Sequence, residues 1–293
     1  MANPAVSDLS DHRGLLVRLR GIRPSLKNAE RLVADLFLKH PAKVLGYTVA
    51  EAAAHAHVSE ATVIRFCRTL GFEGYQDIKF QIARELVVPS RSFTGEEVIE
   101  GDTPGEVMQK VFAFNVQTLQ ETLEVLDAAA LERASDLLDK ADKILVIGVG
   151  TSGANVQDAY NKLFRLGLNV VAQSDSHLQM MEASLLGPNG AVLAITHSGR
   201  TRDPVETLAV ARQAGAKTVV ITSNPRSPVA AQADVVLLTS SRETAFRGEA
   251  IASRLAQMSI VDALYTLIRI KGRGRAIAAE KKIEAVIGQK QIL

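Results

Sequence analysis

Hydroxyls, a glycine and arginines follow an apolar stretch in the segment ITHSGRTRDPVET (195–207). Ser198 and Thr201 offer hydroxyls, and Gly199 lets a ligand come close to the backbone. The guanidinium of Arg200 can pair with a phosphate or with the carboxylate of a sugar acid. Because the free amides and the positive dipole end of a following helix also favour negative charge, the segment predicts an anion-binding loop.

The helix after this loop is marked by three residue types. We expect Asp203 to be the N-cap of this helix and Pro204 to lie in its first turn. Glu206 is expected to be the glutamate of a capping box. The alternative is an ordinary strand-to-helix turn whose charges are solvated.

A second loop of the same kind lies in GVGTSGANVQDAYNKL (148–163), where Thr151 and Ser152 place hydroxyls at a helix start. Its glycines spell G-x-G-x-x-G, a spacing that also suits the pyrophosphate of a dinucleotide: Gly148, Gly150 and Gly153. A dinucleotide site needs an acid about 20 residues further on, and Asp175 is a late candidate. The hydroxyls favour a phosphate, and the dinucleotide stays open as the alternative.

A pair of short helices is predicted in TVAEAAAHAHVSEATVIRFCRTLGF (48–72). Thr48 and Glu51 form a capping box for the first helix, and Ser59 caps the second, which ends before Gly71. Two short helices joined by a turn of about three or four residues have the spacing of a DNA-binding helix-turn-helix. A helical hairpin with no role on DNA is the alternative.

The second of these helices has two distinct faces. Val63, Phe66, Cys67 and Leu70 recur at helical spacing and are expected to pack inward. Arginine and short polar side chains are what major-groove reading needs, and the opposite face supplies them: Ser59, Ala61, Thr62, Arg65, Arg68 and Thr69. Cys67 is expected to be a small core residue, with a redox sensor as the minor alternative.

The elements that position these residues change near residue 90. The first part shows only helical spacing, which predicts an all-α domain over 1–88. After a linker and connecting helix at 89–127, continuous apolar strands alternate with helices over 128–270 and predict a three-layer α/β domain with a parallel sheet. A basic helical tail is expected at 271–293.

Composition sets further limits. The apolar share of 47% can fill a real core, and no apolar run reaches the roughly 20 residues of a membrane span. One cysteine and no secretory pattern favour the cytoplasm. The first 86 residues carry 12 Lys and Arg against 9 Asp and Glu, a modest excess compatible with DNA. His55 and His57 have no neighbouring ligands, so neither a metal nor a cofactor is expected.

Taken together, these motifs resemble the RpiR/MurR family of bacterial transcription regulators. The segment TVAEAAAHAHVSEATVIRFCRTLGFEGYQDIK is similar to its helix-turn-helix domain, and the two loops and SRLAQMSIVDALY (253–265) are similar to its sugar isomerase (SIS) domain. The resemblance implies that Ser152 and Ser198, with Thr201, hold the phosphate of a phosphosugar, and that Thr62 and Arg65 lie on the recognition helix. HSGRT and VSEATVIRFCRTLGF (58–72) are especially similar to members that respond to 2-keto-3-deoxy-6-phosphogluconate, whereas AFRGEAIASR (245–254) is more like other members.

SIS domains also occur in isomerases, which need a base to move a proton between adjacent carbons. Glu249, His197 and His177 are candidates, but Glu249 can equally accept a hydrogen bond from a sugar hydroxyl in a sensor. An isomerase has no use for a DNA-reading domain. We therefore expect a regulator rather than an enzyme, a homodimer or homotetramer on a palindromic double-stranded DNA operator, with a phosphorylated sugar or sugar acid as effector and no membrane partner.

Overall fold

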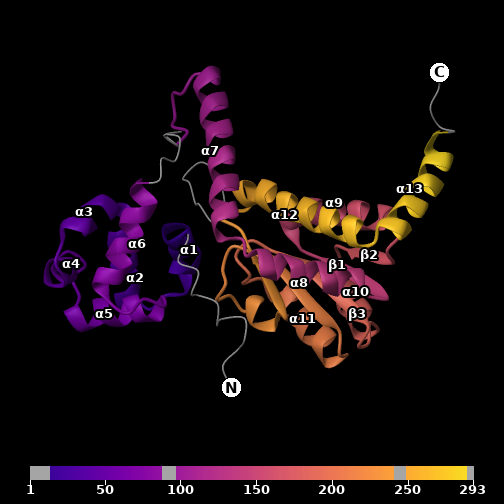
Figure 1. Cartoon of the computed structure of the whole chain (residues 1–293), viewed down its shortest axis with the longest axis horizontal. Coiled ribbons are helices and arrows are strands. Elements are labelled where there is room, and N and C mark those ends of the chain that lie inside the picture. Colours follow the sequence, from indigo (N-terminus) through magenta and orange to yellow (C-terminus); the bar gives the residue numbers. More distant parts are fainter. Residues whose placement is uncertain (1–13, 88–96, 241–248, 289–293) are drawn as a thin grey trace. The chain divides into compact units, whose positions relative to one another are not determined.

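The computed structural model describes residues 14–87, 97–240 and 249–288 and shows two compact units (Figure 1). Unit 1 comprises Met1–Val125 and Ser240–Gly248, and unit 2 comprises Leu126–Thr239 and Glu249–Leu293. The linker expected before helix α7 (Pro104–Val125) lies largely in residues 88–96, outside the described residues.

The described residues of unit 1 contain helices and no β-strand. Its helices are α1 (Leu15–Ile22), α2 (Asn28–Lys39), α3 (Pro41–Gly46), α4 (Val49–His55), α5 (Glu60–Thr69), α6 (Tyr75–Val87) and α7 (Pro104–Val125). The apolar faces of α1 to α6 share one core, in which Phe37 of α2 meets the ring of Phe66 edge to face at a centroid distance of 5.9 Å. The predicted all-α N-terminal domain is confirmed.

Unit 2 contains a parallel sheet of five strands in the order β2-β1-β3-β4-β5. The strands are β1 (Lys143–Ile147), β2 (Val170–Gln173), β3 (Gly190–Ile195), β4 (Lys217–Thr222) and β5 (Val235–Leu238). The helices are α8 (Ala128–Asp139), α9 (Gly153–Arg165), α10 (Ser176–Ser184), α11 (Arg202–Gln213), α12 (Glu249–Lys271) and α13 (Arg273–Ile287). Each of the five strands overlaps an apolar run that predicts a strand: KILVIG (143–148), LNVVAQ (168–173), AVLAIT (191–196), KTVVIT (217–222) and DVVLLT (234–239).

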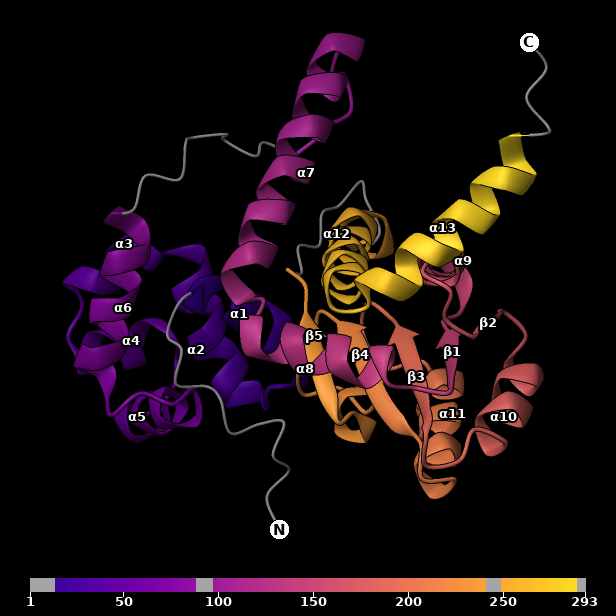
Figure 2. The same cartoon turned by 45° about the vertical axis from the view of Figure 1, so that its right-hand side comes forward.

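Alternate strand residues feed two separate cores, because successive side chains of a strand point to opposite faces. Ile144 and Val146 pack with α8, α9 and α12, whereas Leu145 and Ile147 pack with α10 and α11. Figure 2 shows the sheet between these two helical layers. The predicted three-layer α/β domain is confirmed.

The C-terminal helix α13 projects away from the sheet in both views (Figures 1 and 2). In the first turns of α13, Arg275 forms an ion pair with Asp139 of α8, and Ala276 is buried. None of the helices in the described part of the chain is both long and apolar enough to cross a membrane.

Candidate functional site

The α4–α5 hairpin begins and ends at the residues that the sequence predicts. Thr48 caps α4: its hydroxyl accepts the Glu51 amide at 3.2 Å, and the Glu51 carboxylate accepts the Thr48 amide at 2.7 Å. That backbone hydrogen bond holds the pKa of Glu51 below its usual value. Ser59 caps α5 by accepting the amide of Thr62 at 3.3 Å. His57 adopts a left-handed φ of 53° in the turn between the helices.

The inward face of α5 is the predicted one, since Val63, Phe66, Cys67 and Leu70 are all buried. Burial raises the pKa of the Cys67 thiol to about 12, so the thiol is protonated at physiological pH. A protonated buried thiol suits a core residue and not a redox sensor.

Fewer residues of the predicted outward face of α5 are exposed than the sequence suggests. Ser59, Ala61, Arg65 and Arg68 are exposed. Thr62 is not: it is 9% exposed, and its hydroxyl lies 2.9 Å from that of Ser59. The expectation that Thr62 faces outward is therefore wrong, because its side chain completes the cap of its own helix.

Thr69 is half-buried near the end of α5, and its hydroxyl donates to the carbonyl of Arg65 at 2.9 Å. The basic side chains of α5 are Arg65 and Arg68, and both are exposed. Around this hairpin His55 stacks on Tyr47 with a centroid distance of 4.5 Å. The described residues contain no group of three or more side chains that could hold a metal ion.

The loop after β1 is shaped by two glycines. A Cβ atom on Gly148 would lie 2.8 Å from the carbonyl oxygen of Ile195, so the loop passes directly against the end of β3. Gly150 has a left-handed φ of 60° and opens a short 3₁₀ turn through Ser152. Thr151 is exposed and Ser152 is buried immediately before α9 begins. The free amides of the first turn of α9 thus follow two hydroxyls.

The loop after β3 also turns at a glycine, Gly199, with φ of 66°. Ser198 is half-buried, and its oxygen accepts the amide of Arg200 at 3.4 Å, while the Arg200 side chain is exposed. Thr201 is the N-cap of α11, which starts at Arg202.

The start predicted for α11 is wrong by two residues. Asp203 lies in the first turn and is not its N-cap, and Pro204 occupies the third helical position. Proline fits there because the first four amides of a helix have no intrahelical acceptor. Glu206 pairs with Arg202 at 2.6 Å, one helical turn away, and does not close a capping box.

These two loops meet where the strand order reverses. β1 pairs with β2 on one side and with β3 on the other, and Ile147 lies opposite Ala194 at the carboxyl ends. The helices that follow, α9 and α11, belong to opposite layers. Two helix N-termini and the hydroxyls of Thr151, Ser152, Ser198 and Thr201 therefore converge at a switch point of a parallel sheet, the place where such sheets bind anionic ligands.

A third loop, after β4, supports this site and is not among the loops that the sequence motifs predict. The hydroxyls of Thr222 and Ser223 both donate to the carbonyl of His197, at 2.8 and 2.9 Å. The amide of Val229 donates to the carbonyl of Gly199 at 3.2 Å. The signal was available in the small polar residues of TSNPRSP (222–228) directly after a buried strand.

Two buried amides also fasten the site. Gln257 of α12 donates to the carbonyl of Thr196 at 3.2 Å and accepts from Asn155 of α9 at 2.7 Å. Gln179 donates to the carbonyls of Gly148 and Gln173. Glu249 begins α12, but its side chain lies outside the described residues.

Asp175, the candidate acid for a dinucleotide site, has a structural role. The carboxylate of Asp175 accepts the amide of Leu178 at 2.9 Å and so caps α10.

Known proteins share both halves of this arrangement. Residues 13–88 match a model described as a helix-turn-helix domain of the rpiR family, and residues 137–267 match the SIS domain. An uncharacterized HTH-type transcriptional regulator of Haemophilus influenzae is 34% identical over 271 residues, which span 92% of this chain and 93% of that protein. The chain belongs to the RpiR family of transcriptional regulators. YbbH, an HTH-type regulator of Bacillus subtilis, is 36% identical to this RpiR-family protein over 86% of this chain and 89% of YbbH.

A solved relative has the same fold along nearly the whole chain. The NanR protein of Vibrio vulnificus, complexed with ManNAc-6P, has a TM-score of 0.61 and 26% identity to this RpiR-family regulator, and the match covers 95% of this chain and 100% of that one.

Proposed function

We propose that this RpiR-family regulator binds an operator through α5 and senses a phosphorylated sugar or sugar acid at the loops after β1 and β3. The observation that carries the proposal is the convergence of those loops and two helix N-termini at the switch point of the sheet. NanR, which was solved with ManNAc-6P, supports a phosphosugar as the ligand class.

The residues proposed to hold the ligand divide by chemistry. Thr151, Ser152, Ser198 and Thr201 supply hydroxyls to the phosphate, and Gly150 and Gly199 let the backbone turn towards it. Arg200 is exposed and can reach a carboxylate of a sugar acid, such as 2-keto-3-deoxy-6-phosphogluconate. Glu249 is proposed to accept a bond from a sugar hydroxyl.

The proposal excludes catalysis as the main role of unit 2. Two carboxylates close to the loops have structural roles, since Asp175 caps α10 and Glu206 pairs with Arg202. Turnover of an aldose phosphate that disappears in Glu249→Gln would establish an isomerase instead.

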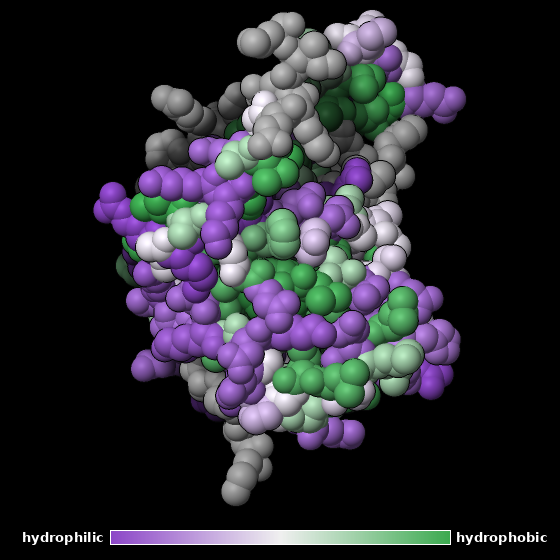
Figure 3. All heavy atoms as spheres, turned by 90° about the vertical axis from the view of Figure 1, so that its right-hand side faces the viewer, coloured by the Kyte–Doolittle hydropathy of each residue, from purple (hydrophilic) through white to green (hydrophobic). Residues whose placement is uncertain are grey.

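We further propose a homodimer or homotetramer that places paired α5 helices on the half-sites of a palindrome. Hydrophobic side chains form patches on the side of unit 2 viewed in Figure 3. The large apolar residues exposed on α9, α10 and α13, or at the C-cap of α10, include Phe164, Leu178, Met181, Leu185, Val286 and Ile287. Such patches mark association surfaces, and sedimentation of the purified protein should give a mass of at least two chains.

A thermal-shift screen tests the ligand class. Phosphosugars, the same sugars without phosphate, and NADH are compared, because a ligand that binds only the folded state raises the apparent stability. Stabilisation by a phosphosugar and not by its bare sugar is the expected result. Stabilisation by NADH alone would favour a dinucleotide at the loop after β1.

A further inference from the structure

The chain passes between its two units at three peptide bonds: Val125–Leu126, Thr239–Ser240 and Gly248–Glu249. The first lies at the end of α7, and the second follows β5. Glu121 in the last turns of α7 and Ser240 therefore lie beside these two crossings. Their side chains form a hydrogen bond within unit 1, and this bond links the chain segments at the first two crossings.

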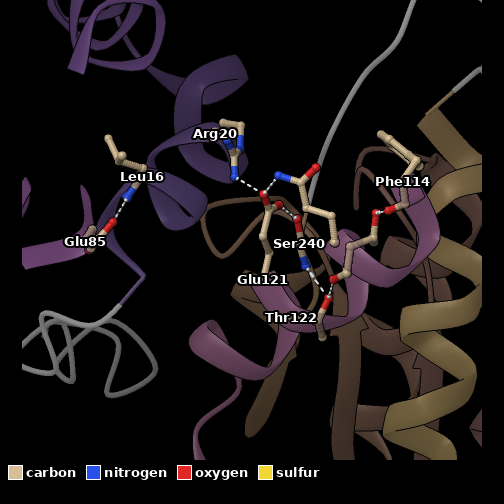
Figure 4. Close-up of polar contacts among 9 residues, drawn as sticks. Leu16, Arg20, Glu85, Phe114, Glu121, Thr122 and Ser240 are labelled. Carbon is tan, nitrogen blue, oxygen red and sulfur yellow. Dashed lines mark hydrogen bonds and ion pairs between the residues drawn. The ribbon is translucent and has the colours of Figure 1, made fainter. Parts of the chain in front are cut away.

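The carboxylate of Glu121 is the centre of this cluster (Figure 4). One oxygen accepts the hydroxyl of Ser240 at 2.7 Å, and the other pairs with the guanidinium of Arg20 at 2.8 Å and accepts the amide of Gln117 at 3.2 Å. Glu121 is only 7% exposed. A buried carboxylate that loses a donor is left with partly uncompensated charge, so displacement of Ser240 favours a new position of Glu121 and of the Arg20 that pairs with it.

Ser240 is held by a second bond to the same helix. Its amide donates to the hydroxyl of Thr122 at 3.0 Å, and that hydroxyl donates in turn to the carbonyl of Thr118 at 2.7 Å. Two bonds from adjacent residues of α7 give Ser240 one defined position.

Arg20 connects this cluster to the helices of the helix-turn-helix domain. It lies on α1, whose first two amides donate to the carboxylate of Glu85 on α6. The start of α1 also packs on α7, since a Cβ on Gly14 would lie 3.1 Å from side-chain atoms of Glu124 and Val125. Helix α6 packs against α5. A shift of Glu121 thus acts on the core that holds the recognition helix.

Ser240 also follows β5 at the carboxyl end of the sheet. The loops after β1 and β3, here called the anion loops, lie at the same end. The amide of the preceding residue, Thr239, donates to the carbonyl of Thr222 at 3.0 Å. The Thr222 hydroxyl donates to the carbonyl of His197, the residue before Ser198. A ligand that moves Ser198 therefore acts on Ser240 through two hydrogen bonds and the chain.

We propose that Glu121 is the positioning residue through which occupancy of the anion loops controls DNA binding by α5. The inference rests on the proposed function and adds the route of regulation. Ligand binding displaces Ser240 from Glu121, the buried carboxylate shifts together with its partner Arg20, and α1 changes its position against α7.

The test compares wild type with Glu121→Gln, which removes the charge that Arg20 needs, and with Ser240→Ala, which removes the hydroxyl donor. Glu132→Gln on α8 is the matched control, because Glu132 is exposed and undergoes the same chemical change. An operator duplex is selected from random DNA with the wild-type protein. Its dissociation constant is measured by fluorescence anisotropy with and without 2-keto-3-deoxy-6-phosphogluconate, N-acetylmannosamine 6-phosphate or glucose 6-phosphate.

Wild type and Glu132→Gln should change operator affinity by roughly 5- to 150-fold on adding the active sugar, the usual range of allosteric coupling. In Glu121→Gln and Ser240→Ala this ratio should fall to within about two-fold of unity, although the sugar still stabilises both variants in a thermal shift. A purely structural role would lower the melting temperature and leave the ratio at its wild-type value, which overturns the inference. If Glu121→Gln does not fold, the ratio for Ser240→Ala decides.

Failure of the proposed function would be visible in the wild type. A wild-type protein that selects no operator or responds to none of the sugars removes both the function and the route. A wild-type response with equal responses in the two variants removes the route alone.

Discussion

Gly199 and Ser227 approach so closely that a Cβ atom on Gly199 would lie 2.2 Å from the hydroxyl oxygen of Ser227. The loop after β3 therefore packs directly on the loop after β4 at this glycine. The φ of Gly199 is also left-handed. The position of Ser198 is therefore set by a neighbouring loop and not by its own sequence alone.

Gly199→Ala should lower the free energy of unfolding of unit 2 by more than Gly187→Ala. Both glycines have left-handed φ values, 66° and 68°, but no atom lies within 4 Å of a Cβ on Gly187. Gly187→Ala therefore isolates the backbone strain of about 1–2 kcal/mol, and the difference between the variants reports the collision with Ser227. Denaturant unfolding measures both. Adding Ser227→Gly should restore part of the loss in Gly199→Ala, and equal losses in the two single variants would contradict the packing described.

Ser152→Ala combined with Ser198→Ala should abolish stabilisation by the active phosphosugar while operator affinity without sugar stays within about two-fold of wild type. The reason is that each substitution removes a hydroxyl from the proposed phosphate site and leaves unit 1 untouched, since distant sites act independently. Ser184→Ala is the control, because Ser184 is exposed and its hydroxyl donates within α10, to the carbonyl of Met181. An undiminished thermal shift in the double variant would place the effector elsewhere.

Arg65→Ala should weaken operator binding by roughly 5- to 150-fold, the effect of losing one bidentate contact of about 1–3 kcal/mol to a base. Arg65 is exposed on the outward face of α5. Arg84→Ala on α6 removes an exposed arginine from the same unit without touching α5 and should change affinity far less. Comparable losses in the two variants would mean that charge alone, and not reading by α5, explains binding. Phosphosugar stabilisation should persist in both.

Cys67 should resist thiol reagents in the folded protein at pH 8. Its pKa of about 12 leaves only about one thiolate in ten thousand at that pH, and the side chain is buried. Labelling by dithionitrobenzoate should therefore follow unfolding and become rapid in denaturant. Raising the pH from 7 to 9 should increase the native rate through the thiolate fraction without reaching the rate of the unfolded chain. Rapid labelling of native protein at pH 7 would show that Cys67 is accessible and reactive.

The sequence predicts those features of the fold that depend on local patterns. The continuous apolar runs locate all five strands, and the capping residues Thr48 and Ser59 locate the starts of α4 and α5, because both signals lie within a few residues. The meeting of the loops that contain Ser152 and Ser198 follows from strand order, which local patterns leave open until the topology is known.

Other features depend on contacts between distant residues. The sequence shows neither the bond of Thr222 to His197 nor the burial of Glu121 between Arg20 and Ser240, since these residues lie 25 or more positions apart. Asp203 predicts a start of α11 that is too late, because aspartate is a common N-cap residue whereas the structure uses Thr201. The polar side chain of Thr62 suggests the outward face, but Thr62 precedes the buried Phe66 by four residues and so shares its face.

Thr62→Val tests that corrected assignment. The substitution keeps the shape of the side chain and removes its hydrogen bond with Ser59, so the free energy of unfolding should fall by about 0.5–1.5 kcal/mol. Operator affinity of the folded protein should stay within about two-fold of wild type, because the hydroxyl is bonded within the helix cap. Ala61→Val, one residue earlier on the exposed face, should do the opposite and weaken operator binding with little change in stability. A tenfold loss of operator affinity in Thr62→Val at unchanged stability would return Thr62 to the DNA-reading surface.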